Sequence, residues 1–223
     1  MLRNRYNILL GIVVVHLFVL TLALPRPWND LVNIGVAPVA ALMVRFITGR
    51  PRDAWAMLIL ASSASLLNLV LPWGAVPLSV DLLKVGLWCL APAYLAQRVF
   101  VTIYDAEAIT HAEISGAVAV YLLLALVFAN VFEALHVLDP GAIQFGANFP
   151  EQSGFREILY FSFVTLSTLG YGDVAPASAL ARDIAVVEAV TGLMYMAILV
   201  ARFVSLHSAD RLERRRKQAR EHG

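Results

Sequence analysis

The residues best suited to chemistry form one short stretch, Thr165–Asp173, which reads Thr-Leu-Ser-Thr-Leu-Gly-Tyr-Gly-Asp. Successive backbone carbonyls can point to one side of a chain only with unusual φ and ψ values. Gly170 and Gly172 tolerate such values because a residue without a Cβ adopts a positive φ at little steric cost. The Thr168 hydroxyl can add one more oxygen at the start of the row. Such a row of oxygens can replace the water around a cation that enters a narrow passage.

This stretch resembles the pore signature of potassium channels, Thr-x-Gly-Tyr-Gly-Asp, which Thr168–Asp173 matches at every fixed position. The resemblance covers residues 113–206, under half of the chain. It implies K⁺ as the permeant ion, no cofactor and no other metal site. Since one chain supplies one filter strand, it also implies a ring of four copies. The implied selectivity filter consists of Thr168, Leu169, Gly170, Tyr171 and Gly172.

The resemblance also implies residues that support the filter. Asp173 closes the signature and is expected to hydrogen-bond to the pore helix, where Tyr160 and Phe161 take the paired aromatic positions. Glu133 and Glu188 lie in long apolar segments, and a carboxylate in hydrocarbon must find a partner. We expect Glu188 to brace the filter or the pore helix, with an ordinary interhelical hydrogen bond as the equal alternative. For Glu133 we expect a bond to the top of the last span.

The segment after the filter, Ala179–Leu206, is expected to line the cavity below it. Gly192 lies where many potassium channels carry a glycine hinge, although close helix packing explains a glycine there equally well. Apolar residues that recur at helical spacing are expected to form a constriction that gates by dewetting, although a packing face has the same pattern. These residues are Leu193, Met196, Val200 and Val204.

The composition is typical of a polytopic membrane protein. Of the 223 residues, 60% are hydrophobic, and the net charge is +1. This is too apolar for a soluble domain of this size, and the charge gives no reason to expect a nucleic-acid partner. The single cysteine, Cys89, cannot form an intrachain disulfide and suggests no metal site.

The hydrophobic pattern predicts an all-α membrane protein with six transmembrane helices. We expect a four-helix N-terminal unit at 1–104, a pore domain at 105–206 and a basic cytoplasmic tail at 207–223. A re-entrant pore helix, Phe155–Ser167, and the filter loop lie between spans five and six. The first span is interpreted as retained, because its apolar run is longer than a usual signal core. The spans are expected at Asn7–Leu24, Leu31–Thr48, Ala54–Leu71, Leu78–Val101, Ile114–Leu135 and Ala179–Leu206.

The distribution of basic residues predicts the orientation of the chain. Arginines at both ends of the chain and in alternate loops fall on one side of the predicted spans, which places both termini in the cytoplasm. The filter then faces outward across the plasma (cell inner) membrane. The basic residues of Arg211–Arg220 are favoured as positive-inside anchors, and binding of anionic lipid is the alternative.

We therefore expect a passive, homotetrameric, potassium-selective channel and not an enzyme. Voltage gating is not expected, because the fourth span, Leu78–Val101, contains only Lys84 and Arg98 as basic residues. One alternative is a weakly selective cation channel or a silent subunit. Another is a membrane sensor or scaffold that uses the N-terminal four-helix unit. The sequence does not indicate the gating stimulus.

Overall fold

The structure is a computed structural model, which describes residues 5–21, 26–71, 76–106, 110–146, 149 and 154–221. Apart from two three-residue strands, the regular elements in this part of the chain are helices. In chain order they are α1 (Arg5–Thr21), α2 (Arg26–Thr48), α3 (Pro51–Val70), α4 (Leu78–Tyr104), α5 (His111–Leu138), β1 (Ile143–Phe145), α6 (Phe155–Leu166), β2 (Val174–Pro176) and α7 (Ala179–Glu221).

Four of the described helices are long and apolar enough to cross a membrane. They are Pro51–Val70, Leu78–Tyr104, His111–Leu138 and the first part of α7, Ala179–Ser205. Arg5–Leu20 and Ile34–Thr48 are apolar but shorter. The helical, multi-pass membrane class expected from the sequence is therefore confirmed.

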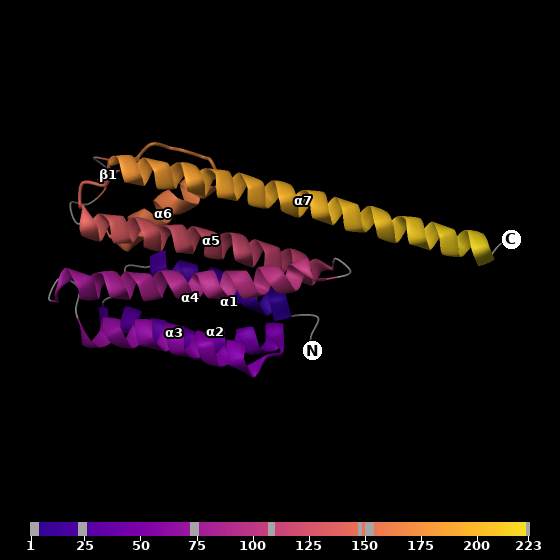
Figure 1. The fold of residues 1–223 in the computed structure, drawn as a ribbon, viewed down its shortest axis with the longest axis horizontal. Helices are drawn as coiled ribbons and strands as arrows, with labels where there is room; N and C mark the ends of the chain where they lie inside the picture. The colour runs from indigo at the N-terminus through magenta and orange to yellow at the C-terminus, as the bar shows by residue number, and fades with distance from the viewer. Residues whose placement is uncertain are drawn as a thin grey trace.

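Helix α5 lies in the middle of the molecule (Figure 1), with α1 and α4 on one side and α6 and α7 on the other. Helices α2 and α3 pack against each other and complete the N-terminal unit. Four alanines of α5, Ala117, Ala119, Ala125 and Ala129, are 0% exposed. Small residues let helix backbones approach closely. Helix α5 can therefore pack on both sides at once, which joins the N-terminal helices to the pore segment.

The two helices that lead toward the filter begin with capping contacts. At the start of α5, the Thr110 backbone N–H donates to Glu113 Oε2 at 2.9 Å. At the start of α6, the Gly154 N–H donates to Glu157 Oε2, also at 2.9 Å. Burial opposes ionisation of Glu157, but hydrogen bonds from the backbone N–H groups of Gly154 and Glu157 and from Arg156 outweigh it and lower its pKa. A negative charge at this end also complements the helix dipole.

Helix α7 runs without a break from the filter end of the molecule to Glu221, and its last part extends beyond the other helices (Figure 1). The backbone of the expected tail, 207–223, thus continues α7 as far as residue 221, whereas the side chains of the tail lie outside the described residues. Where α7 passes the end of α4, Arg202 donates to the carbonyls of Ile103, Tyr104 and Ala106. These bonds place a basic donor at the C-terminal end of α4, where helix carbonyls lack intrahelical partners.

Helix α7 touches α6 most closely at Gly192. A Cβ at this position would lie 2.2 Å from the Leu166 carbonyl oxygen and 3.0 Å from Leu166 Cδ1. The Tyr121 hydroxyl of α5 donates to the same carbonyl at 3.2 Å, which restricts its movement. In this structure Gly192 is therefore a position of close helix packing.

We predict that Gly192→Ala destabilises the protein by about 1–3 kcal/mol, because the added methyl group pushes α6 and α7 apart. Gly86→Ala in α4 is the matched control, since a Cβ there meets nothing within 4 Å. Alanine favours a helix over glycine by roughly 0.5–1 kcal/mol, so the control should be neutral or stabilising. Thermal unfolding in detergent compares the two variants, and equal midpoints would contradict the prediction.

Candidate ion-conducting site

The chain leaves α6 through a tight turn that sets the start of the expected filter. The Ser167 N–H donates to the Phe163 carbonyl at 3.0 Å, and the Leu169 N–H donates to the Val164 carbonyl at 2.9 Å. The Ser167 hydroxyl also donates to the Phe163 carbonyl, at 2.6 Å. The last carbonyls of the helix are thus bonded locally, and the filter strand starts directly after the negative end of the α6 dipole.

The expected filter has a positive φ at every second residue. The values are 59° at Thr168, 58° at Gly170 and 77° at Gly172, whereas Leu169 and Tyr171 are not in this region. A backbone that alternates between left- and right-handed conformations aligns its carbonyls on one side. The residues predicted to supply the carbonyl oxygens therefore have a backbone conformation suited to a row of such oxygens.

The positive φ of Thr168 was not foreseen from the sequence. A positive φ could be expected at Gly170 and Gly172, because glycine adopts it readily. A β-branched residue such as threonine strongly disfavours a positive φ. Thr168 is the one non-glycine residue with a positive φ in the described part of the chain. Backbone strain of this kind concentrates at functional sites, where the surrounding structure holds it in place.

The outer end of the filter is fixed by Asp173. Its Oδ2 accepts a hydrogen bond from the Tyr160 hydroxyl at 2.8 Å, and its Oδ1 accepts one from the Val174 N–H at 3.0 Å. Its carbonyl accepts the Gly146 N–H at 2.8 Å, next to the antiparallel pairing of β1 with β2. The bond to Asp173 raises the pKa of Tyr160. Tyr160 and Asp173 thus meet as the sequence predicted.

Phe161, expected beside Tyr160 in support of the filter, lies instead between helices. Its ring contacts Phe132 of α5 edge-on, with 4.9 Å between ring centroids, and both side chains are buried. On a helix, neighbouring positions point about 100° apart, so two adjacent aromatics cannot face the same partner. Tyr160 contacts Asp173 at the end of the expected filter, and Phe161 packs α6 against α5.

Glu188 of α7 is 0% exposed and lies against Ser162 of α6. The Ser162 Oγ is 2.5 Å from Glu188 Oε1 and 2.7 Å from the carbonyl oxygen of Ala125 on α5. A serine hydroxyl has one proton, and a carbonyl oxygen can only accept. Both contacts can be hydrogen bonds at once only when Glu188 carries a proton and donates it to Ser162. One side-chain pair thus connects α5, α6 and α7 behind the filter.

Glu133 does not make the bond to the last span that we expected from the sequence. It lines a cavity shared with α1 to α4, and its Oε2 has no hydrogen-bond partner among the described residues. The apolar pattern of α5 does not reveal which of its two packed sides an acid faces, because both sides are covered by helices. In this structure Glu133 therefore belongs to the N-terminal unit and not to the filter support.

One face of α7 is uncovered in the single chain. Its exposed residues include those expected to form the cavity and gate, namely Leu193 at 63%, Met196 at 45%, Val200 at 54% and Val204 at 60% exposed. Leu169 and Tyr171 of the filter are also exposed, by 58% and 66%. The filter and the expected cavity lining thus share a surface that the described chain does not bury.

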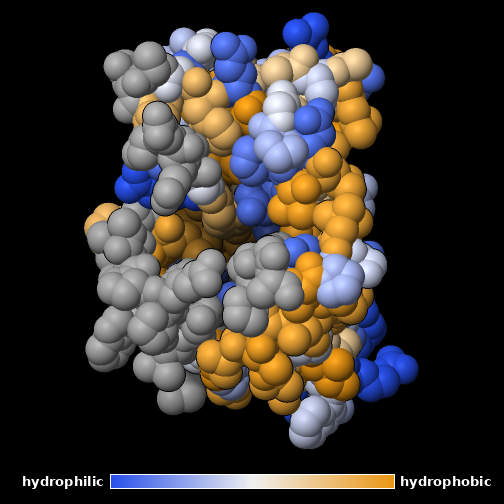
Figure 2. Space-filling view, turned by 90° about the vertical axis from the view of Figure 1, so that its left-hand side faces the viewer, coloured by the Kyte–Doolittle hydropathy of each residue, from blue (hydrophilic) through white to orange (hydrophobic). Residues whose placement is uncertain are grey.

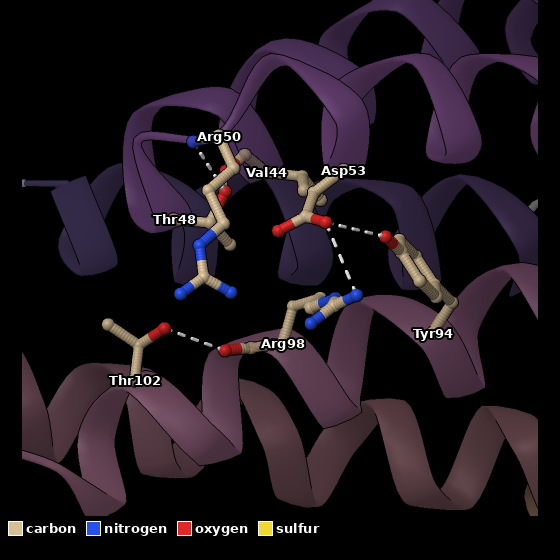
Figure 3. Close-up of polar contacts among 7 residues, drawn as sticks. All are labelled: Val44, Thr48, Arg50, Asp53, Tyr94, Arg98 and Thr102. Carbon is tan, nitrogen blue, oxygen red and sulfur yellow. Dashed lines mark hydrogen bonds and ion pairs between the residues drawn. The ribbon is translucent and has the colours of Figure 1, made fainter.

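The sequence analysis also missed a buried acid, Asp53, at the start of α3. Its Oδ1 accepts a hydrogen bond from the Tyr94 hydroxyl at 3.2 Å and forms an ion pair with Arg98 at 3.2 Å (Figure 3). Asp53 is only 5% exposed, although it lies in the first turn of α3, directly after a loop. The other basic residue of α4, Lys84, is 0% exposed and pairs with Asp81 at 2.8 Å. Both basic residues of α4 are therefore held by carboxylates.

We predict that Glu188→Gln is tolerated and Glu188→Val is not. The glutamine amide can still donate to Ser162, whereas valine leaves a buried polar atom without this partner at a cost of about 1–3 kcal/mol. Asp183→Val, at an exposed position of the same helix, controls for the replacement of a carboxyl side chain by valine in α7. Thermal unfolding in detergent should rank wild type, Gln and control together, with Val below them. Equal stability of the Gln and Val variants would show that the contact contributes nothing.

Comparisons with known proteins agree with this geometry. Residues 117–208 match the family model described as an ion channel. Two-pore potassium channel 4 of Arabidopsis thaliana is 31% identical over 84 residues, which are 38% of this chain and 30% of that relative. The chain thus matches less than a third of the relative's length, and no solved structure matches significantly. We conclude that the segment 117–208 resembles the pores of potassium-channel-like proteins, and that the comparisons point to an ion channel and not to an enzyme.

Proposed function

We propose that the chain forms a passive potassium-selective channel. The observation that carries this proposal is the positive φ at Thr168, Gly170 and Gly172, which suits a row of backbone carbonyls that replaces the water around K⁺. The name of the Arabidopsis relative also refers to potassium. In this proposal the carbonyls of the filter bind the ion, and Asp173 with Tyr160 holds the strand in place.

The proposed assembly is a homotetramer. One strand of carbonyls cannot surround an ion, and closed cyclic symmetry supplies the missing strands. The exposure of Leu169 and Tyr171 and of the apolar face of α7 supports this arrangement, because copies of the chain would cover these residues. The exposed α7 residues would then line the cavity and the gate.

The proposed topology has six spans, with α6 and the filter as a re-entrant segment between α5 and α7. Arg5 donates to the Ile47 carbonyl at 3.1 Å, and Arg202 donates to the end of α4, so these basic groups gather at the end opposite the filter. Positive groups favour the cytoplasmic side. This supports cytoplasmic termini in the cell inner membrane, where the basic tail would meet anionic lipid.

We predict that the purified protein in liposomes passes K⁺ far better than Na⁺ and that Gly170→Ala abolishes the flux. A Cβ at Gly170 meets nothing within 4 Å in the chain, but φ is +58° there, so the change tests the backbone conformation itself. Gly86→Ala, where a Cβ also meets nothing but φ is ordinary, is the matched control and should conduct.

Comparable Na⁺ and K⁺ fluxes would favour a weakly selective cation channel over the proposed one. A folded tetramer without flux would favour a silent subunit or a sensor. Tetramer formation is measured separately, by the mass of the protein in detergent, so that assembly and conduction are tested independently.

We predict weak voltage dependence. Moving Lys84 or Arg98 across the membrane would break its ion pair with Asp81 or Asp53. Steep gating needs about three or four mobile charges per subunit, each worth about 2.3 kcal/mol per 100 mV. In a planar bilayer with symmetric K⁺, the open probability should change little between about −100 and +100 mV. A sigmoidal curve equivalent to more than about two gating charges per tetramer would contradict this.

A further inference from the structure

A cavity of about 220 Å³ lies between α1, α2, α3, α4 and α5, and Phe155 of α6 also contributes to its lining. Figure 2 views the end of the molecule that carries the loops between α5 and α7, and this end is hollowed near its centre. The inner part of the cavity is apolar, with Met43, Met57 and Leu95 among its lining residues. An engineered cavity of roughly 150 Å³ already admits benzene, so this one has room for a slightly larger molecule.

Polar side chains line the other part of the cavity. Glu133 lies near the filter end of α5 and His16 in the second half of α1, and both face this space. Glu133 Oε2 and His16 Nδ1 are buried and have no hydrogen-bond partner among the described residues. Asn130 is 5% exposed, and its Nδ2 donates to the Leu126 carbonyl of its own helix. The cavity therefore combines an apolar body with a polar end that contains a carboxyl group.

The chain supplies no described cation for this carboxyl group. Lys84 is paired with Asp81 at 2.8 Å, and Arg98 with Asp53 at 3.2 Å. No ion pair joins Glu133 to His16 in the described part of the chain. Buried polar and charged groups are costly unless they are paired, so Glu133 favours a ligand that brings a donor or a positive charge.

We propose that this cavity binds a small apolar molecule that carries a protonated amine. The amine donates to the Glu133 carboxylate, and the hydrocarbon part fills the space beside Met57 and Leu95. The cavity is distinct from the expected filter, since no described residue of 167–173 or of α7 lines it. The site is therefore a receptor for a cationic amphiphile between the N-terminal helices and α5, and its occupation can be measured without ion flux.

The test uses benzylamine as the probe, because its ring is the size of benzene and its amine is protonated at neutral pH. Binding of radiolabelled benzylamine to the purified full-length protein in detergent is measured by equilibrium dialysis, with benzyl alcohol as the neutral competitor. We expect saturable binding that Glu133→Gln weakens by about tenfold or more, because it removes a charge-assisted hydrogen bond. Asp139→Asn, an exposed carboxyl at the same end of α5, is the matched control and should bind as the wild type does.

A second variant tests the cavity itself. Ala61→Leu adds volume to the lining without touching Glu133, so it should also reduce binding. Absence of saturable binding to the wild type would overturn the proposal. Equal binding by wild type and Glu133→Gln would overturn it as well, since the carboxylate would then contribute nothing to binding. Equal affinity for benzyl alcohol would do the same, since the carboxylate would then not distinguish the charged amine from the neutral alcohol. The measurement needs no ion flux, so a failure of this proposal can be distinguished from a failure of the proposed channel function.

Discussion

The carbonyl oxygen of Leu166 is the point on which the packing of the pore segment depends. It ends α6, directly before the filter strand, and receives a hydrogen bond from Tyr121 of α5. Gly192 of α7 approaches it so closely that a Cβ would lie 2.2 Å away. One atom therefore sets the spacing of three helices, and the strained backbone at Thr168 begins two residues later. A displacement of this carbonyl would alter the position of the whole filter.

The same three helices are joined by polar side chains that use backbone carbonyls of α5. Ser162 of α6 donates to Ala125, and Tyr195 of α7 donates to Ala117, both at 2.7 Å. A helical carbonyl has a second lone pair, so it can accept these bonds without losing its own helical bond. In a membrane, where hydrophobic burial between helices contributes little, such bonds and close packing of small residues hold helices together. The alanine-rich surface of α5 serves both purposes.

The sequence was informative where a residue type has few uses. Gly170, Gly172 and the pairing of Tyr160 with Asp173 followed from the motif, because a positive φ or a hydrogen bond is what those residues provide. It could not reveal the φ of Thr168, which the neighbouring turn imposes against the residue's own preference. Nor could it assign Glu133 to a side of α5, because a helix that packs on two sides and is apolar on both has no periodic pattern that distinguishes its neighbours.

The length of helix α7 and its two contacts with neighbouring helices have a mechanical consequence. At about 1.5 Å per residue, its 43 residues form a rod about 64 Å long, fixed to the filter region at Gly192 and to the end of α4 at Arg202. A force on the part of α7 beyond residue 206 therefore acts through a lever with Arg202 as its fulcrum. The short arm ends at the carbonyl of Leu166, so a displacement at the far end reaches that carbonyl as a smaller displacement under a larger force.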